Sequence, residues 1–137
     1  MPVHGPYSPA VRVGDFLFVS AQSGVDPATG TVPADGAEAE CRQALLNLER
    51  VLHAAGTDLR AVVKTTVFYS DPDDLPAINR VYAETFRVDP PARAAVIVRL
   101  AGGRSVSIEA IADTAGRGQE IPDSRTFAAE GEQIAGR

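Results

Sequence analysis

The chain has 137 residues, enough for one compact domain with a modest hydrophobic core. Its net charge is −5 and its basic residues are scattered, which argues against nucleic acid as the main partner, because phosphate binding needs a clustered positive face. A lone cysteine, Cys41, excludes an intrachain disulfide framework, and no apolar stretch is long enough to span a membrane. Since no secretion signal is visible either, we expect a cytoplasmic protein without a membrane partner.

Two short strands joined by a tight turn are predicted near the start of the chain. Apolar residues over 10–13 and 16–22 favour the strands, and Gly14-Asp15 is a good two-residue hairpin turn. Residues 23–33, rich in Pro, Gly and Asp, then indicate a loop.

A long amphipathic helix is predicted next. Asp35 and Glu38 have the spacing of a capping box, so the helix is expected to begin there. Apolar residues then recur at helical spacing until Gly56, which ends the helix. This apolar stripe consists of Cys41, Ala44, Leu45, Leu48, Val51, Leu52 and Ala55.

The middle of the chain predicts a strand over 61–69 and then a second helix. Alternation along the strand gives one face made of Val63, Thr65, Val67 and Tyr69. The acidic stretch 71–74 offers N-cap candidates for the helix. The apolar side of that helix consists of Leu75, Ile78, Val81, Tyr82 and Phe86.

Two further strands are predicted over 94–100 and 105–112, with Ala101-Gly102-Gly103-Arg104 as a hairpin-like loop between them. The element order is that of an α+β domain, residues 1–113, with a mixed β-sheet and two helices on one face. Residues 114–137 are rich in Gly, Ala, Glu and polar residues, and we expect a largely disordered tail.

Arg93 carries the strongest chemical signal in the chain. It follows two prolines, which disfavour helix, and precedes an apolar run typical of a buried strand. An arginine at the mouth of such a strand is costly to bury unless a carboxylate or another anion meets its guanidinium. Two interpretations follow: a salt bridge with a carboxylate of the same or a neighbouring subunit, or a site for a carboxylate ligand.

Short motifs spread along the chain strengthen the second interpretation. They include Gly5-Pro6-Tyr7 and the segments 14–22, 26–30 and 63–68, followed by Asn79-Arg80-Val81-Tyr82, Pro91-Ala92-Arg93 and Ser107-Ile108-Glu109-Ala110-Ile111-Ala112. In this order and at these spacings, they resemble the reactive intermediate deaminase family, also called Rid or YjgF. The resemblance covers Gly5 to about Ala112.

The resemblance implies both an architecture and a chemistry. The family has a chorismate-mutase-like fold, assembled as a homotrimer around a barrel with active sites at the subunit interfaces. Its deaminase branch, the 2-iminobutanoate/2-iminopropanoate deaminases, hydrolyses 2-imino or enamine acids to 2-keto acids and ammonia without a metal or cofactor. Such an enzyme needs a clamp for the substrate carboxylate, a planar slot for the imine and one positioned water.

The resemblance also implies roles for four residues. Arg93 matches the carboxylate-binding arginine, and Tyr7 matches a tyrosine that lines the pocket, so both are expected in binding and catalysis. Tyr7 has the alternative of a packed aromatic ring with a surface hydroxyl. Ser20 matches a serine that can donate to the substrate, or else it is an ordinary polar residue ending a strand. Asn79 matches a helix asparagine that contacts substrate, with a helix-surface amide or an interface hydrogen bond as alternatives.

Two positions depart from the family pattern. The deaminase branch usually carries glutamate in place of Ser107, where it orients or activates the attacking water, and a serine has no comparable basicity. Glu109 lies on the same strand face, about 6–7 Å further along, where a structural carboxylate at the subunit interface is the alternative to a catalytic one. Ala94-Ala95 replaces the usual Ser-Cys or Ser-Thr, so the pocket is expected to be more apolar.

Three functions are therefore compatible with the sequence. The first is a cofactor-independent enamine/imine deaminase with catalytic Arg93, Tyr7 and Ser107. The second is a pathway-specific relative that promotes hydrolysis, tautomerisation or cyclisation of another carboxylate-bearing reactive intermediate. The third is a non-catalytic trimer that binds small molecules, favoured by the missing glutamate and opposed by the retention of Arg93, Tyr7 and Ser20.

Overall fold

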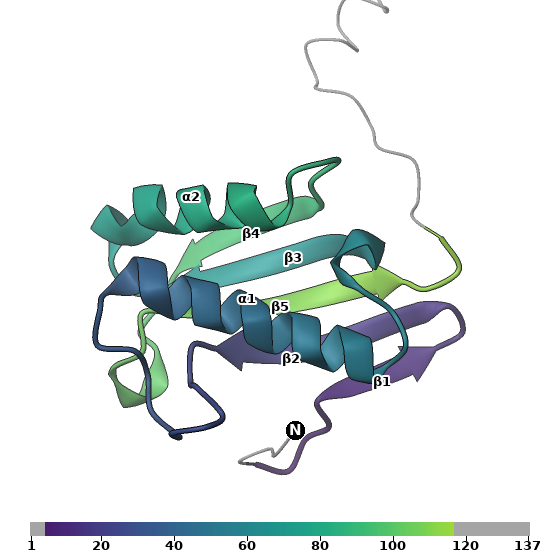
Figure 1. Ribbon diagram of the computed structural model, residues 1–137, viewed down its shortest axis with the longest axis horizontal. Coiled ribbons are helices and arrows are strands. Elements are labelled where there is room, and N and C mark those ends of the chain that lie inside the picture. The colour runs from purple at the N-terminus through teal and green to yellow at the C-terminus, as the bar shows by residue number, and fades with distance from the viewer. Residues whose placement is uncertain (1–4, 117–137) are drawn as a thin grey trace, which may run out of the picture.

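The computed structural model describes residues 5–116, which form a five-stranded mixed sheet with two α-helices on one face (Figure 1). The α+β expectation is thus confirmed. None of the helices in this range is long and apolar enough to cross a membrane. The main elements are β1 Ala10–Val13, β2 Phe16–Ser23, α1 Ala37–Ala54, β3 Val62–Tyr69, α2 Leu75–Thr85, β4 Ala92–Ile97 and β5 Val106–Asp113.

The strands lie in the order β1-β2-β5-β3-β4. Helix α2 carries the chain back across the sheet, so β4 runs parallel to β3, whereas β5 is antiparallel to both β2 and β3. The predicted hairpin between the last two strands is therefore wrong. Because β4 already occupies one side of β3, the chain turns through the 3₁₀ segment Ala101–Gly103 and inserts β5 on the other side.

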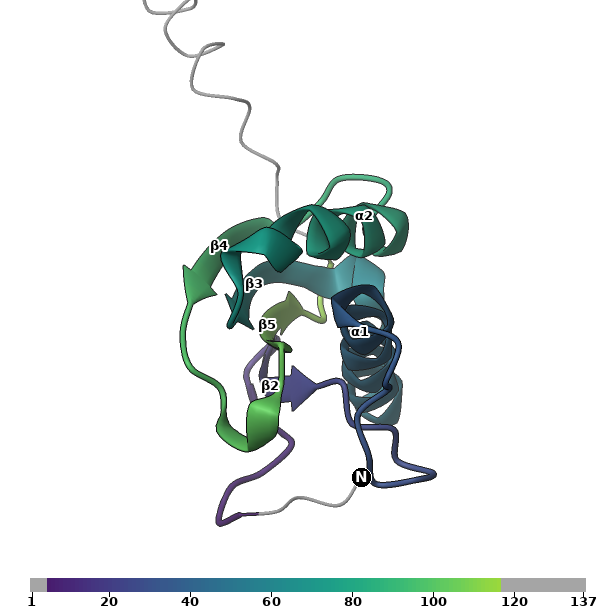
Figure 2. The ribbon, with the colours of Figure 1, turned by 90° about the vertical axis from the view of Figure 1, so that its left-hand side faces the viewer.

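The helices cover one face of the sheet, and the hydrophobic core lies between them and the strands (Figure 2). The predicted apolar stripe of α1 is confirmed, since its residues are buried and Ala55 is partly buried. Every second residue of β5 faces this core: Val106, Ile108, Ala110 and Ala112. We call this side of the sheet the covered face.

Local details differ from the sequence expectations at two places. Helix α1 begins after Gly36, which has a φ of 96°, and no side chain caps it. The capping box is therefore wrong, and Glu38 lies within ion-pair distance of Arg42 and Arg80 instead. In β3 the register slips between Val62 and Lys64, so Val62 rather than Val63 faces the core.

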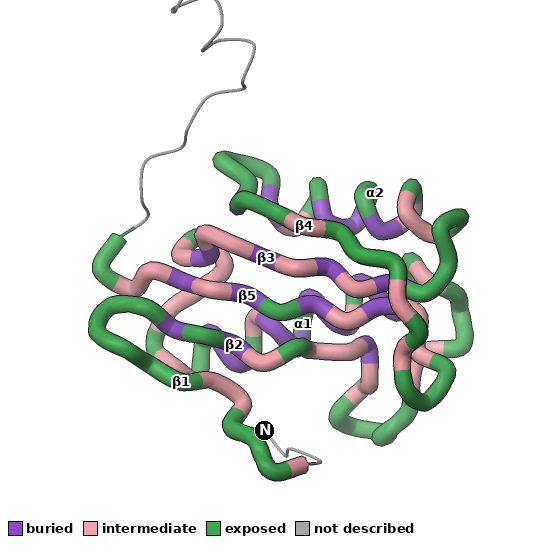
Figure 3. The backbone as a smooth tube through the Cα atoms, turned by 180° about the vertical axis from the view of Figure 1, so that it is seen from behind, coloured by how far each residue is buried: buried purple, intermediate pink, exposed green. Residues whose placement is uncertain are grey.

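The opposite side of the sheet is uncovered in the described chain (Figure 3). We call it the open face. Large apolar side chains remain exposed along β1 and β2, namely Val11, Val13, Phe16 and Phe18, at 46–61% of their accessible area. Contiguous exposed apolar residues of this kind mark an interaction surface.

Candidate functional site

Arg93 lies inside β4, at the edge of the sheet. The strand begins at Ala92 rather than Ala94, so Arg93 is its second residue and not a residue at its mouth. The predicted burial of this strand is also wrong, because five of the six β4 residues are exposed as an edge strand. Arg93 pairs with Thr65 of β3 in the parallel ladder, and it points toward α2.

Two residues of α2 hold the Arg93 side chain. Its Nη1 donates a hydrogen bond of 2.8 Å to Oδ1 of Asn79, and its Cζ lies 4.9 Å from the centroid of the Tyr82 ring. Asn79 and Tyr82 are three residues apart and therefore share one face of the helix. Within residues 5–116 no carboxylate lies at ion-pair distance from Arg93, so the described chain does not supply the salt bridge considered above.

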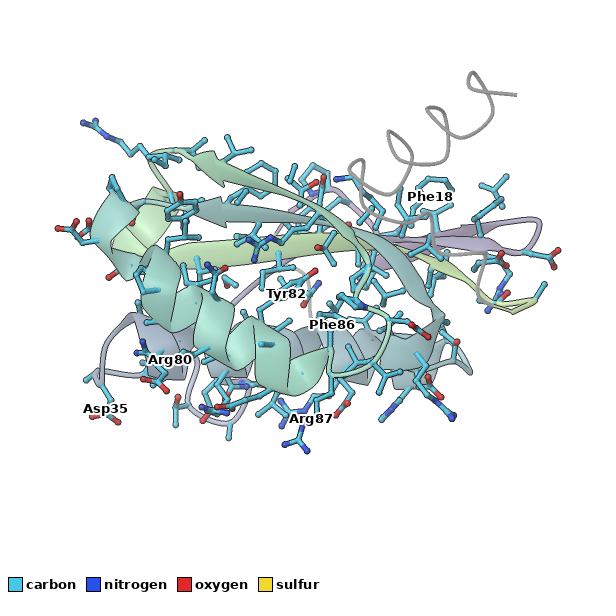
Figure 4. All side chains as sticks on the ribbon, turned by 90° about the horizontal axis from the view of Figure 1, so that it is seen from above. Phe18, Asp35, Arg80, Tyr82, Phe86 and Arg87 are labelled. Carbon is cyan, nitrogen blue, oxygen red and sulfur yellow. The ribbon has the colours of Figure 1, made fainter. Side chains whose placement is uncertain are left out.

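Tyr82, labelled near Phe86 in Figure 4, is itself held from two sides. Its hydroxyl is 2.7 Å from Oγ1 of Thr65, a residue with no exposed surface. Its ring contacts Phe86, with centroids 4.8 Å apart and planes at 46°. Burial raises the pKa of the Tyr82 hydroxyl, while the Thr65 hydrogen bond and the Arg93 charge oppose the shift. The hydroxyl is therefore neutral at physiological pH, and the ring presents its face to the guanidinium.

The contact with Arg93 also fixes the orientation of the Asn79 amide. A guanidinium only donates, so the oxygen of Asn79 faces it, and Nδ2 is left as a donor for other groups. No described residue accepts a hydrogen bond from Nδ2. The remaining donors of exposed Arg93 and the free Nδ2 of Asn79 together form an all-donor group, suited to an anion such as a carboxylate.

Ser20 and Tyr7 belong to a second group, on the other side of the molecule. Ser20 Oγ donates to the carbonyl oxygen of Ser8 at 2.7 Å, and its N–H donates to that of Pro9 at 2.9 Å, so Ser20 anchors the segment that carries Tyr7. The Tyr7 side chain is 52% exposed. Between Val19 and Gln22 the register of β2 against β5 shifts, which places Ser20 beside a bulge.

Ser20 also lines a hollow of about 280 Å³ on the open face. Besides Ser20, three polar side chains and several apolar residues line this hollow. The lining includes Val11, Phe18, Lys64, Thr66, Glu109 and Ile111.

Ser107 lies apart from both groups. It is half-buried on the open face of β5, between Ser23 of β2 and Phe68 of β3. Oε1 of buried Glu40 accepts hydrogen bonds from the N–H groups of Ser105 at 2.6 Å and Val106 at 3.4 Å, and so fixes the start of this strand.

Within one chain, the structure therefore brings together only part of the predicted site. Arg93 contacts Asn79, and Ser20 holds the segment of Tyr7, but β2 and β4 are separated by three strand spacings, roughly 14 Å. Arg93 lies on the covered side and Ser20 on the open face. Thr65 and Tyr82 were not predicted as site residues, although the three-residue spacing of Asn79 and Tyr82 was a usable signal.

The described residues offer little to a metal or to thiol chemistry. Within residues 5–116 no cluster of three or more His, Cys, Asp or Glu side chains could hold a metal ion. Cys41 is a fully buried residue of α1, and burial raises its pKa to about 12. It is a core residue, as the sequence predicted.

The topology defines a small α+β domain, and Arg93 and Asn79 form a group of hydrogen-bond donors at the edge of its sheet. A family model described as Endoribonuclease L-PSP matches residues 1–114. A RutC family protein of Sinorhizobium fredii is 49% identical over 108 residues, covering 78% of this chain and 86% of that protein. The 2-iminobutanoate/2-iminopropanoate deaminase of Mus musculus is 45% identical over 109 residues, covering 79% and 81%.

Solved structures agree with these sequence matches. The crystal structure of E. coli TdcF with bound serine has a TM-score of 0.77 at 36% identity, covering 81% of this chain and 90% of that one. The chain belongs to the Rid/YjgF family.

Proposed function

We propose that this protein is a hydrolytic deaminase of 2-imino acids and their enamine tautomers. The observation that carries the proposal is the Arg93 guanidinium, held by Asn79 and Tyr82 while its other donors remain free. Relatives that are 42–46% identical bear the name 2-iminobutanoate/2-iminopropanoate deaminase. The serine in TdcF supports an amino-acid-like ligand for this fold, since serine carries the same α-carboxylate.

The reaction needs positioning more than strong acid or base groups. In the proposed mechanism Arg93 takes the substrate carboxylate in a two-pronged contact, and Asn79 Nδ2 donates to one of its oxygens. Water adds to the imine carbon and forms a carbinolamine. The C–N bond then breaks, the nitrogen leaves as ammonia, and the carbon becomes the keto group of the product. Holding water and imine in near-attack geometry supplies much of the gain.

We further propose that the site is completed by a second copy of the chain, in a homotrimer. Arg93 and Asn79 lie at the β4 edge of the sheet, whereas Tyr7 and Ser20 lie beside β2, three strands away. Within one chain they are too far apart to contact the same small substrate. The exposed apolar residues of the open face provide the surface for association. Tyr7 and Ser20 of a neighbouring copy would then face the imine end of the substrate.

Ser107 supports an alternative within the same fold. It has no side-chain group of useful basicity, so the attacking water would depend on backbone carbonyls or on other side chains. A pathway-specific relative, or a non-catalytic carboxylate-binding protein, would fit the same donor group around Arg93.

One assay separates these functions. An amino-acid oxidase or a threonine dehydratase generates 2-iminopropanoate or 2-iminobutanoate in situ, and keto-acid release is followed with and without this protein. Acceleration that disappears in Arg93→Ala supports the deaminase. Carboxylate binding at Arg93 without acceleration supports the pathway-specific or non-catalytic alternative. Absence of both results would overturn the proposal.

A further inference from the structure

We propose that Thr65 and Tyr82 are positioning residues for carboxylate recognition, acting through Arg93. Their buried hydroxyl pair fixes the Tyr82 ring, and the ring fixes the plane of the guanidinium. This inference rests on the proposed function only in assuming that Arg93 binds a carboxylate.

Thr65 is connected to Arg93 by two independent routes. Through the backbone, it is the ladder partner of Arg93 in the parallel pair β3–β4. Through its side chain, it is 2.7 Å from the Tyr82 hydroxyl, and the Tyr82 ring lies 4.9 Å from the Arg93 Cζ. Three elements, β3, α2 and β4, are thereby linked around a single side chain.

The Thr65 hydroxyl is not needed to fill the core. Thr65 and its neighbour Val67 both face the core with no exposed surface, and valine has nearly the shape of threonine. A buried hydroxyl must be paired to avoid a desolvation cost, and replacing both partners by apolar groups of the same shape can be nearly neutral for stability. The Thr65–Tyr82 pair is therefore better explained by orientation than by stability.

The guanidinium needs more than the Asn79 contact to be oriented. A single hydrogen bond to Oδ1 leaves Arg93 free to pivot about that bond. The Tyr82 ring face supplies the second constraint, because a cation over the ring keeps its distance and tilt. Phe86 blocks one side of that ring and the Thr65 hydroxyl holds its far end, so the ring cannot turn away. A two-pronged contact with a carboxylate depends on this fixed plane.

The test compares a charged and an uncharged ligand. NMR titration measures the Kd of 2-oxobutanoate and of 2-oxobutanamide, which lacks the carboxylate, for wild type and variants of the full chain. In Thr65→Val the Kd of 2-oxobutanoate is expected to rise about three- to tenfold, while that of 2-oxobutanamide stays unchanged. Thr65→Ser restores the hydroxyl and should restore the wild-type ratio. Thr85→Val, which removes a threonine hydroxyl bonded to Val81 O on α2, is the matched control and should change neither Kd.

The double variant Thr65→Val/Tyr82→Phe distinguishes a loss of orientation from a loss of stability. It removes both partners of the buried pair, so it should melt close to wild type, yet it should bind 2-oxobutanoate as weakly as either single variant. Variants that bind both ligands as wild type does, or that lose both equally, would overturn the positioning role.

The outcomes for the two proposals are distinguishable. If the wild type binds 2-oxobutanoate through Arg93 but hydrolyses no imine, the deaminase proposal fails and the positioning role stands on the binding data. If imines are hydrolysed and Thr65→Val leaves the ligand ratio unchanged, only the positioning role fails. If the wild type binds no carboxylate, both are overturned.

Discussion

The two faces of the sheet are made by the same strands, but they differ in what their side chains contact. On β5, Ile108 has no exposed surface under the helices, whereas Ile111 lines the hollow on the open face. Buried polar groups between the covered face and the helices, such as Thr65 of β3 and Glu40 of α1, are hydrogen-bonded. The covered face thus holds the fold together, whereas the open face leaves large apolar side chains exposed.

The largest expected effect is a difference between matched substitutions on the two faces. Ile108→Ala should lower the free energy of unfolding by about 2–5 kcal/mol, because it leaves a cavity in the core. Ile111→Ala should cost less than about 1 kcal/mol in the monomer, since its surroundings are already open to water. Urea unfolding of both variants at a concentration where the protein is monomeric measures this difference.

Association gives the complementary readout for the same pair. Light scattering at micromolar concentration should show a trimer for the wild type and weaker association for Ile111→Ala. Equal destabilisation of the monomer by the two substitutions would contradict the distinction between the faces.

The next effect concerns Arg93, in the edge strand β4, where the two faces of the sheet meet. Arg93→Ala should lose about 2–4 kcal/mol of carboxylate binding or transition-state stabilisation, and Arg93→Lys should lose most of it, because a point charge cannot make the two-pronged contact. Both variants should keep the wild-type melting temperature, because Arg93 is exposed on an edge strand. Unfolding or subunit dissociation in Arg93→Ala would instead assign the residue to a structural salt bridge.

A smaller gain is expected from a carboxylate on the open face. Ser107→Glu should raise imine hydrolysis by about tenfold, since positioned general bases typically contribute about 10²–10⁴-fold and this one has no supporting partners. Initial rates with 2-iminobutanoate measure the gain, and Ser107→Gln, of similar size without basicity, is the control. A loss of activity with carboxylate binding intact would favour the pathway-specific alternative.

The smallest effect tests where the folded unit ends. Thr114 Oγ1 accepts a hydrogen bond of 2.9 Å from Arg12. Its hydroxyl and its N–H both donate to the carbonyl oxygen of Asp15, at 2.8 and 2.7 Å. Thr114 is therefore bonded to the β1–β2 hairpin and belongs to the folded domain. A chain ending at Gly116 should therefore be about 1 kcal/mol more stable than one ending at Asp113. Thermal melts of the two truncations decide this, and identical melting temperatures would place the boundary at 113. Of the predicted tail, 114–137, residues 117–137 lie outside the described residues.

Much of the fold could be predicted because local pattern and tertiary packing agree. The stripe of α1 and the alternation of β5 each point to the same buried face in the structure. Errors arose where long-range pairing overrides local signals. The slip in β3 depends on its partner β5, and the insertion of β5 beside β3 follows from where α2 returns the chain.

The site was predictable in its residue types but not in its connections. Arg93 and Asn79 were expected in one pocket, and they are hydrogen-bonded. Thr65 was assigned only to one face of a strand, since nothing in the alternation pattern indicates that its hydroxyl meets Tyr82. The separation of Arg93 from Ser20 depends on strand order, which no local motif encodes.

Mixed oligomers test most directly whether one active site is shared between two copies of the chain, as we propose. Arg93→Ala and the double variant Tyr7→Phe/Ser20→Ala, each inactive alone, are co-expressed with different tags, and oligomers carrying both tags are isolated. In a cyclic trimer every such mixture contains one intact site, so imine hydrolysis should return to about one third of the wild-type rate. Mixed trimers as inactive as their parents would contradict the claim and place the whole site within a single chain.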